Sequence, residues 1–453
     1  MIKFLRKKKI IIFLILLVIF SFKAKAKDEV LSITLTGDSI ITRKLSVYKE
    51  PNFLKMIEII RSSDVAFTNL ETLFHDYETY PMHKSGGTYM RSEPELAKEL
   101  KWAGFDMVSR ANNHAGDYGV LAMNLTSKYV REAGLVEAGV GNSLPEAREA
   151  KFIETSKARI ALISCSSTFP DHIRAGKTRG DIPPRPGINP LRFTIKYLIP
   201  EKEFNILKKI KKQLISLEYE REGEKENELN FFGNKFIKAE KFDIITEPNP
   251  EDIKEISAVV KNASRLADYV IVSFHSHESY KKKEIPAKFI VSFAHVMIDS
   301  GADICVGHGP HVLRGIEIYK GKPIFYSLGN FIFQNETLLR LPYENYERYK
   351  LGPEHHVADF NDARYKNDTR GFPSKPDYWE SVIAVTEWKG EKLYKIKLYP
   401  ITLGFGKPRT VRGRPFLTDK KLSEKIIERL KKLSAEFGTK IQFQNGIGLI
   451  KSD

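Results

Sequence analysis

Cysteine is almost absent from this chain, which has two cysteines in 453 residues. Two cysteines cannot form a disulfide framework, and neither stands in any of the polar motifs described below. Cys165 and Cys305 each lie in an apolar run, so we expect buried free thiols; a single disulfide is the alternative. A metal site in this protein would therefore be built from carboxylates, amides and imidazoles.

Long apolar runs are also missing. The longest, residues 10–22, is shorter than the roughly 20 residues that a helix needs to cross a bilayer. It follows a basic segment at 1–9 and precedes Ala24-Lys25-Ala26, a pattern typical of a secretory signal peptide over residues 1–26. The alternative is an uncleaved anchor formed by residues 10–22. In both cases we expect export to the periplasm or the extracellular space.

Sequence motifs of nucleic-acid binding, such as helix-turn-helix, RNP and zinc-finger patterns, are absent, so we expect no nucleic-acid partner. The formal charge is +16, and it falls to +9 without residues 1–26, which carry seven basic and no acidic side chains. This balance favours anionic partners such as phosphorylated lipids, teichoic-type polymers or acidic capsules, and is equally typical of a plain solvated surface. A hydrophobic content of 42% excludes general disorder.

Strand and helix signals alternate along much of the chain. In the first half the pattern predicts strands at 30–36, 65–68 and 105–109, and helices at 52–61, 94–102 and 118–133. The alternation returns with strands at 269–274 and 303–306. This rhythm is typical of a layered α/β domain.

We expect one main domain, because the polar motifs span residues 38–311 and must converge. Its main part is residues 27–335, with an insertion at about 170–245. The insertion should be an irregular surface loop up to residue 200 and then a charged helix. Residues 336–453 should supply a long loop, a β-hairpin and a helix that complete the same domain.

Five short polar segments follow apolar, strand-like runs in this order: Gly37-Asp38, Asn69-Leu70-Glu71, Asn112-Asn113-His114, His275-Ser276-His277 and Gly307-His308-Gly309-Pro310-His311. The ends of strands in an α/β sheet are where catalytic groups gather. Carboxylates, amide oxygens and imidazoles suit divalent Mn, Fe, Zn or Mg. The segments together predict one site for one or two such ions.

The first three segments combine charged and neutral candidates. Asp38 follows a glycine that permits a tight turn, although an isolated aspartate often caps a turn or helix. Glu71 has the same ambiguity, and it is our choice for the carboxylate that bridges two ions. Asn113 offers a neutral amide oxygen, and the adjacent His114 can protonate a leaving group without binding metal. An ordinary polar turn is the alternative for this pair.

The last two segments carry imidazoles. His275 is favoured as a ligand because the apolar run ends just before it, and His277 is the weaker candidate. His308 and His311 share one constrained loop, and two histidines rarely lie so close without a function. We therefore expect both to be ligands.

These segments, with Asp117, Gly119 and Tyr326-Ser327-Leu328-Gly329-Asn330-Phe331, resemble the CapA family of bacterial capsule or poly-γ-glutamate biosynthesis proteins. The likeness covers about residues 31–335. That family is similar to calcineurin-like metallophosphoesterases, which implies a four-layer α/β/β/α sandwich of two mixed sheets. The resemblance also implies His114 as the catalytic acid and six metal ligands: Asp38, Glu71, Asn113, His275, His308 and His311.

The resemblance implies an exported protein of surface-polymer synthesis, and we expect a metal-dependent hydrolase that acts on an anionic envelope polymer or its precursor. The alternative is a non-catalytic accessory that binds the polymer and passes it on at a membrane synthase complex. The phosphoesterase D-x-H start is here Asp38-Ser39-Ile40, without its histidine. One metal position thus lacks a ligand, and this departure favours the alternative.

Arg179 and Arg185 lie on a proline-stiffened segment and could bind carboxylate or phosphate groups of the substrate. A solvated loop is the alternative. Replacing both arginines by Ala should weaken the binding of an acidic polymer, as measured by titration with poly-γ-glutamate. Unchanged affinity would refute this assignment.

Overall fold

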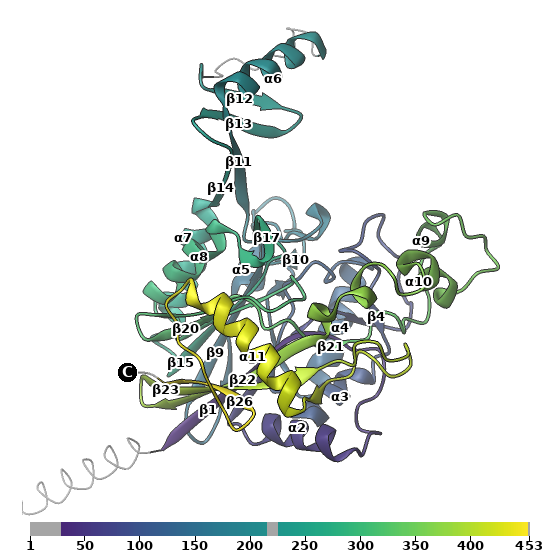
Figure 1. Cartoon of the computed structure of the whole chain (residues 1–453), viewed down its shortest axis with the longest axis vertical. Helices are drawn as coiled ribbons and strands as arrows, with labels where there is room; N and C mark the ends of the chain where they lie inside the picture. Colours follow the sequence, from purple (N-terminus) through teal and green to yellow (C-terminus); the bar gives the residue numbers. More distant parts are fainter. Residues whose placement is uncertain (1–28, 215–224, 452–453) are drawn as a thin grey trace, which may run out of the picture.

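The computed structural model describes residues 29–214 and 225–451. Two sheets pack face to face and helices cover their outer faces (Figure 1). The predicted four-layer α/β/β/α sandwich of two mixed sheets is therefore confirmed. The expected leader, 1–26, lies outside the described residues. Within the described ranges, no helix is long and apolar enough to span a bilayer.

The larger sheet has ten strands and the smaller has six. The larger runs in the order β25 (Gln442–Gln444), β26 (Ile447–Lys451), β23 (Lys392–Thr402), β22 (Glu380–Lys389), β1 (Val30–Ile40), β2 (Val65–Leu70), β5 (Met107–Ser109) and β6 (Val136–Ala138), with β21 (Asn330–Phe333) beside β1 and β24 (Phe416–Leu417) beside β23. The smaller runs in the order β19 (Ile316–Tyr319), β20 (Lys322–Phe325), β18 (Ile304–His308), β15 (Tyr269–His275), β9 (Arg159–Ser166) and β8 (Lys151–Glu154).

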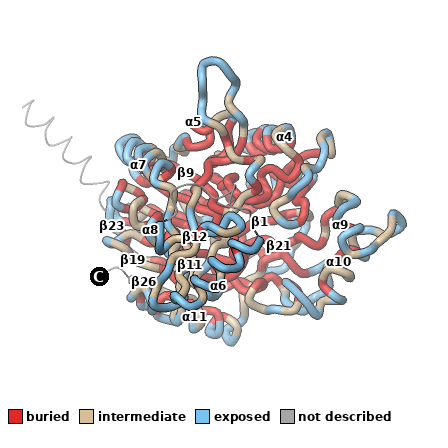
Figure 2. Tube along the Cα trace, turned by 90° about the horizontal axis from the view of Figure 1, so that it is seen from above, coloured by how far each residue is buried: buried red, intermediate tan, exposed pale blue. Residues whose placement is uncertain are grey.

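The main core lies between the two sheets. Leu31, Ile33 and Leu35 alternate along β1 and point into this core, where they meet Ile160 and Leu162 of β9. Because side chains of a strand alternate between its faces, the intervening residues face the outer layers. Figure 2 shows that the buried chain gathers around β1 and β9.

Helices cover the two outer faces. The larger sheet is covered by α2 (Pro51–Arg61), α3 (Leu96–Ala103) and α4 (Gly119–Glu132), and the smaller by α7 (Pro250–Ala263) and α8 (Lys288–Asp299). A further helix, α11 (Lys420–Ala435), packs against the inter-sheet core. Cys165 and Cys305 lie in the smaller sheet as buried free thiols, as expected.

The helix α7 shows how the local sequence sets an element. Asn249 caps it by accepting hydrogen bonds from the backbone N–H groups of Glu251 and Asp252, and Pro250 occupies its first turn. Two acidic side chains in that turn complement the helix dipole. Ile256 and Val260, one turn apart, are buried against the smaller sheet. The N-terminal cap and the apolar face therefore both favour a helix over these residues.

The insertion is a sheet with one helix, and it stands away from the body (Figure 1). It contains β11 (Phe193–Pro200), α6 (Glu201–Leu214), β12 (Glu228–Phe231), β13 (Asn234–Ala239) and β14 (Asp243–Pro248). Our expectation of an irregular loop as far as residue 200 is wrong for its last eight residues, which form β11. The local sequence did not predict β11 because the strand pairs with β13 and β14, which come later in the chain. The predicted charged helix is described as far as Leu214.

The segment after residue 335 returns to the body. It begins with α9 (Tyr343–Glu347), α10 (Val357–Tyr365), η3 (Phe372–Ser374) and η4 (Pro376–Trp379), where we expected only a long loop. The following hairpin, β22–β23, pairs with β1 in the larger sheet. Shorter elements complete the chain: α5 (Leu144–Arg148), η1 (Asp171–Ile173), and the strand pairs β3 (Leu73–Phe74) with β4 (Arg91–Ser92), β7 (Val140–Gly141) with β10 (Gly187–Ile188), and β16 (Ser279–Tyr280) with β17 (Lys282–Pro286).

Leu162 tests the inter-sheet core. It is fully buried on β9, so the Leu162→Ala variant should lose about 2–5 kcal/mol of unfolding free energy through lost transfer energy and a residual cavity. Urea titration measures this loss. The matched control is Leu121→Ala, since Leu121 is 51% exposed and should change stability by less than about 0.5 kcal/mol. Equal losses in the two variants would contradict the assigned core.

Candidate metal centre

The site lies where strands of both sheets end. Asp38 pairs in register with Asn69 of β2 and with Asn330 of β21. In the smaller sheet His275, the last residue of β15, pairs with His308, the last residue of β18. These strands run parallel within their sheets, so their carboxyl ends deliver the polar segments to a common edge.

Two glycines permit the close approach of these segments. A Cβ atom on Gly37 would lie 1.9 Å from the carbonyl oxygen of Gly329, so only glycine allows β1 to pass the turn before β21. Gly309 has φ 106°, and a Cβ there would lie 2.7 Å from Cδ2 of His277 and 3.0 Å from Nε2 of His275. Both positions therefore require glycine for the imidazoles and Asp38 to converge.

Asp38 is completely buried and held in place by polar neighbours. Its Oδ1 accepts a hydrogen bond of 2.8 Å from Asn69 Nδ2, and its Oδ2 accepts one of 3.1 Å from the backbone N–H of Gly309. His311 Nδ1 lies 3.4 Å from Oδ2 and His308 Nδ1 lies 3.6 Å from Oδ1. Burial acts to raise the pKa of this carboxyl, but the imidazoles of His311, His308 and His275 outweigh burial and hold the pKa below its usual range. Asp38 is thus an anion.

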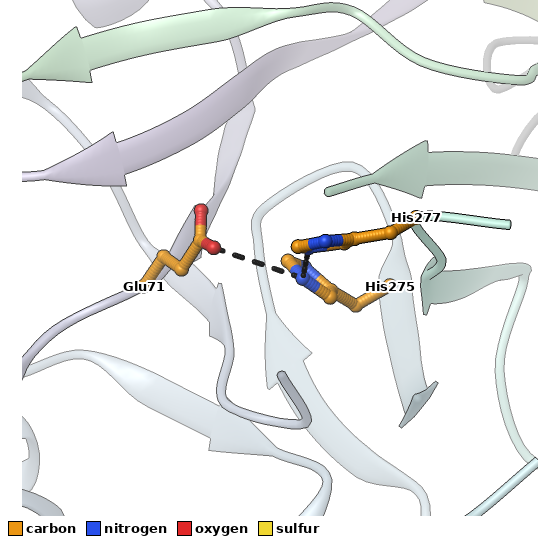
Figure 3. Close-up of side chains that lie close together, drawn as sticks. All are labelled: Glu71, His275 and His277. Atoms are coloured by element: carbon orange, nitrogen blue, oxygen red, sulfur yellow. Dashed lines mark hydrogen bonds and ion pairs between the residues drawn. The ribbon is translucent and has the colours of Figure 1, made fainter. Parts of the chain in front are cut away.

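Glu71 is also completely buried, and neither carboxylate oxygen has a hydrogen-bond partner among the described residues. Its Oε1 lies 3.7 Å from Nε2 of His275, 3.9 Å from Nε2 of His311 and 4.0 Å from Nε2 of His114. Figure 3 shows the carboxylate pointing toward the ring of His275. Burial, and then the negative charge of Asp38, raise the pKa of Glu71 well above its usual value. Without a cation this raised pKa favours the neutral acid, and a divalent cation beside Glu71 would instead stabilise the carboxylate.

His275 and His277 lie side by side next to this carboxylate (Figure 3). Their Nε2 atoms are 3.0 Å apart, and Nδ1 of His275 lies 3.3 Å from Nδ2 of Asn69. Burial lowers the pKa of His275 well below its usual value, and burial together with His311 lowers the pKa of His277 to about 3. The lowered pKa values favour the neutral imidazole, which is the form that binds metal.

Asn113 and His308 contribute further atoms without partners. The amide of Asn113 donates from Nδ2 to the carbonyl of Gly86 at 2.9 Å, and its buried Oδ1 accepts no hydrogen bond from any residue that the structure describes. Neither ring nitrogen of His308 has a hydrogen-bond partner among the described residues, and burial lowers the pKa of His308 to about 4. A buried amide oxygen and a neutral imidazole that lack partners fit ligand positions.

Other side chains orient the site groups. His311 Nδ1 donates to Oδ1 of Asn330 at 2.8 Å, so its Nε2 faces Glu71 as an acceptor. His114 Nδ1 donates to Oδ2 of Asp117 at 2.7 Å. The Asp117 carboxylate in turn accepts hydrogen bonds from the backbone N–H groups of Gly86 and Met90. Asp117 therefore orients this loop.

The donor set fits a divalent cation. Ligand atoms of Glu71, His275 and His277 lie within 4.8 Å of one another, and so do those of Asp38, Glu71 and His311. Glu71 belongs to both groups, which agrees with its predicted bridging position. A site of imidazole nitrogen and carboxylate oxygen atoms, without sulfur, suits Mn, Fe or Zn. Mg and Ca are more often bound by oxygen atoms alone. The ligand assignments themselves remain predictions.

A cavity of about 210 Å³ opens above this edge. Its polar wall includes Asn113, His114, His277 and His311. The remaining lining is apolar and basic and includes Phe333, Phe372, Tyr378, Lys283 and Arg364. A substrate in this cavity would therefore meet His114 and the cationic side chains of Lys283 and Arg364.

The structure brings together every predicted metal ligand and His114, but it places the two predicted arginines elsewhere. Arg179 is exposed and pairs with Asp181 at 2.6 Å, while Arg185 is exposed and donates to the carbonyl of Arg174. Neither lines the cavity, so their substrate role remains a prediction. Lys283 and Arg364 line it instead, and no motif marked them.

Sequence reasoning also assigned no role to Asn69 and Asn330. Both stand inside segments that the sequence marked, Asn69-Leu70-Glu71 and Gly329-Asn330-Phe331. That position was the only signal, since an asparagine that orients a ligand looks the same in sequence as one in a turn.

Comparison with known proteins agrees with this geometry. The family model described as bacterial capsule synthesis protein PGA_cap matches residues 32–335. The chain belongs to this family. It is 37% identical over 432 residues to the uncharacterized protein y4sH of Sinorhizobium fredii (strain NBRC 101917 / NGR234), with 92% of each chain covered.

Two further proteins are less similar in sequence. The capsule biosynthesis protein CapA of Bacillus anthracis is 26% identical over 314 residues, which cover 68% of this chain and 61% of the relative. The crystal structure of a hypothetical protein from Thermus thermophilus aligns with a TM-score of 0.34 and 14% identity, over 82% of this chain and 98% of that one. The CapA resemblance inferred from the motifs is thus confirmed at the level of the family.

Metal addition tests the centre. In chelator-treated protein, Mn²⁺ or Zn²⁺ at 100 times its Kd should raise the unfolding free energy by about 2.7 kcal/mol, because the native state alone presents the assembled ligands. Thermal denaturation with and without metal measures this. Glu71→Gln should remove most of the gain, and the matched Glu317→Gln should keep it, since Glu317 bonds His295 and Tyr326 outside the site. A full gain in Glu71→Gln would contradict the assignment.

Proposed function

We propose that this PGA_cap family member is an exported, metal-dependent hydrolase that acts on an anionic polymer of the cell envelope or on its precursor. One observation carries the proposal: the buried Glu71 carboxylate has no donor among the described residues and has three imidazole nitrogens within 4.0 Å. Such a carboxylate is stabilised by a cation rather than by the protein alone.

A divalent ion at this site would polarise the scissile group and acidify a water molecule. The protein groups have separate tasks. Asp38, Glu71 and the neutral imidazoles supply compensating charge and lone pairs. His114 faces the cavity, and Asp117 fixes its ring so that Nε2 points inward to deliver a proton to the leaving atom.

The cavity supports an anionic substrate. Lys283 and Arg364 line the same cavity as the candidate metal ligands, and Arg364 is positioned by a hydrogen bond to Oγ1 of Thr88. Cations there would offset the charge of a carboxylate or phosphate next to the scissile bond. The B. anthracis relative is named for capsule biosynthesis, and we carry that role to this chain as part of the proposal.

A second candidate is the non-catalytic accessory that binds polymer and passes it on at a membrane synthase complex. Ile40 favours it. This residue stands two positions after Asp38, where the phosphoesterase pattern has a histidine, and it lines the cavity without offering a ligand atom. A site with one ligand fewer holds its second ion more weakly, so binding without turnover is the expected behaviour of this candidate.

His114→Ala separates the two. If the protein is a hydrolase, the variant should keep its metal but lose about 10²–10⁴-fold in kcat, because general acid catalysis contributes that much. Metal analysis and hydrolysis assays on phosphodiester and γ-glutamyl substrates measure both. The matched control is His295→Ala on α8, whose imidazole pairs with Glu317 and should leave kcat unchanged.

Two other outcomes would contradict parts of this proposal. Wild-type protein with neither metal nor turnover would refute the hydrolase and support the accessory role. Turnover that survives in His114→Ala would refute the assignment of the acid while leaving a metal-dependent reaction.

A further inference from the structure

A second cavity adjoins the metal cavity. Its volume is about 780 Å³, and the two share Lys283, Arg364, Phe372 and Tyr378. These four side chains lie between the two cavities, so the second cavity borders the metal cavity at Lys283, Arg364, Phe372 and Tyr378. We call the second cavity the basic groove. Its floor is built by α10, η3 and the chain that joins them, on the α9–α10 lobe that projects from the body in Figure 1.

The charge of the basic groove is entirely of one sign. Five cations line it, and no aspartate or glutamate does: Lys283, Arg364, Lys366, Arg370 and Lys375. Within the described part of the chain, none of the five forms a salt bridge. Lys283 lies over the ring of Tyr378, 4.5 Å from its centroid, and Arg364 lies 5.0 Å from that of Tyr365. Cations held over rings without counter-ions are available to an external anion.

The acids of the same segment are occupied elsewhere. Asp362 pairs with Arg409 at 2.6 Å, Asp368 pairs with Arg412 at 2.6 Å, and Asp377 pairs with Arg429. Asp359 accepts a hydrogen bond of 2.8 Å from the backbone N–H of His356 and caps α10. The basic groove therefore keeps its positive charge because arginines outside it neutralise the nearby carboxylates.

The like charges also act on one another. Burial, and then the positive charge of Lys375, lower the pKa of Lys283. The nearby Glu284 acts in the opposite direction but more weakly, so a net repulsion between the lysines remains and costs stability in the free protein. A ligand that brings several negative charges relieves this repulsion, whereas a single anion relieves only part of it.

We propose that the basic groove binds the successive anionic groups of a linear polymer whose next unit enters the metal cavity. The site then recognises a chain of several repeats rather than one repeat. The ligand is a linear polyanion with one carboxylate or phosphate per repeat. This inference rests on the proposed function, because it assigns the substrate class of the same site.

Binding of oligomers to the full protein tests the inference. The probes are a fluorescently labelled dimer and octamer of γ-linked glutamate, with a glycerol-phosphate octamer as second arm, all measured by fluorescence anisotropy at fixed ionic strength. Wild-type protein should bind an octamer more tightly than the dimer. The Arg370→Gln, Lys375→Gln double variant should lose about tenfold in octamer affinity, as expected for two partly exposed charged contacts, and less for the dimer.

The matched control is Lys254→Gln with Lys261→Gln. Both lysines are exposed on α7, away from either cavity, and their replacement changes the net charge equally. Octamer affinity should stay within twofold in this variant. An equal loss in both double variants would show a general charge effect and overturn the inference. Equal affinity of wild-type protein for dimer and octamer, or no binding of either octamer, would also overturn it.

The two octamers distinguish a polycarboxylate from a polyphosphodiester, and the comparison of the γ-linked glutamate octamer with the dimer measures the length dependence that the inference requires. The experiment distinguishes an error in the basic-groove inference from an error in the proposed hydrolase function. Length-dependent binding without hydrolysis by wild-type protein would refute the hydrolase and keep the basic groove. Hydrolysis by wild-type protein without length-dependent binding would refute the basic groove and keep the hydrolase.

Discussion

Two carboxylates are buried at one edge of this molecule, and only one of them is satisfied by the protein. Asp38 is held by Asn69 and the backbone of Gly309, whereas Glu71 has no hydrogen-bond donor among the described residues. A buried carboxylate is costly unless a cation or hydrogen-bond donors stabilise it, and burial accordingly raises the pKa of Glu71. Imidazoles lie within 4.0 Å of Glu71, and glycines at 37 and 309 let these chain segments approach one another closely.

The sandwich makes this convergence possible. Strands β1 and β2 bring the carboxylates from one sheet, and β15 and β18 bring imidazoles from the other. The apolar layer between the sheets holds the two sets in register, so side chains about 270 positions apart meet. Residues that touch no substrate then fix ring orientation: Asn330 for His311 and Asp117 for His114. Such support is what a preorganised site needs.

Positive charge is distributed unevenly. Most buried arginines form ion pairs, as Arg110 does with Glu137, whereas Arg314 donates to backbone carbonyl groups. Among the described residues the cations of the basic groove form no salt bridge, and two of them, Lys283 and Arg364, also line the metal cavity. Net charge therefore says less about partners than the places where cations lack counter-ions.

The sequence by itself determined the layered α/β class, the order of the metal-site segments and their place at strand ends, because alternation, turn residues and apolar runs are local properties. It identified Asp38, Glu71, His308 and His311 as members of one site. Only the tertiary structure decided which of their atoms lack partners, since hydrogen bonding joins residues distant in the chain. The same reason explains why β11 was missed and why Lys283 and Arg364 gave no signal: pairing and cavity walls come from contacts between segments far apart in sequence.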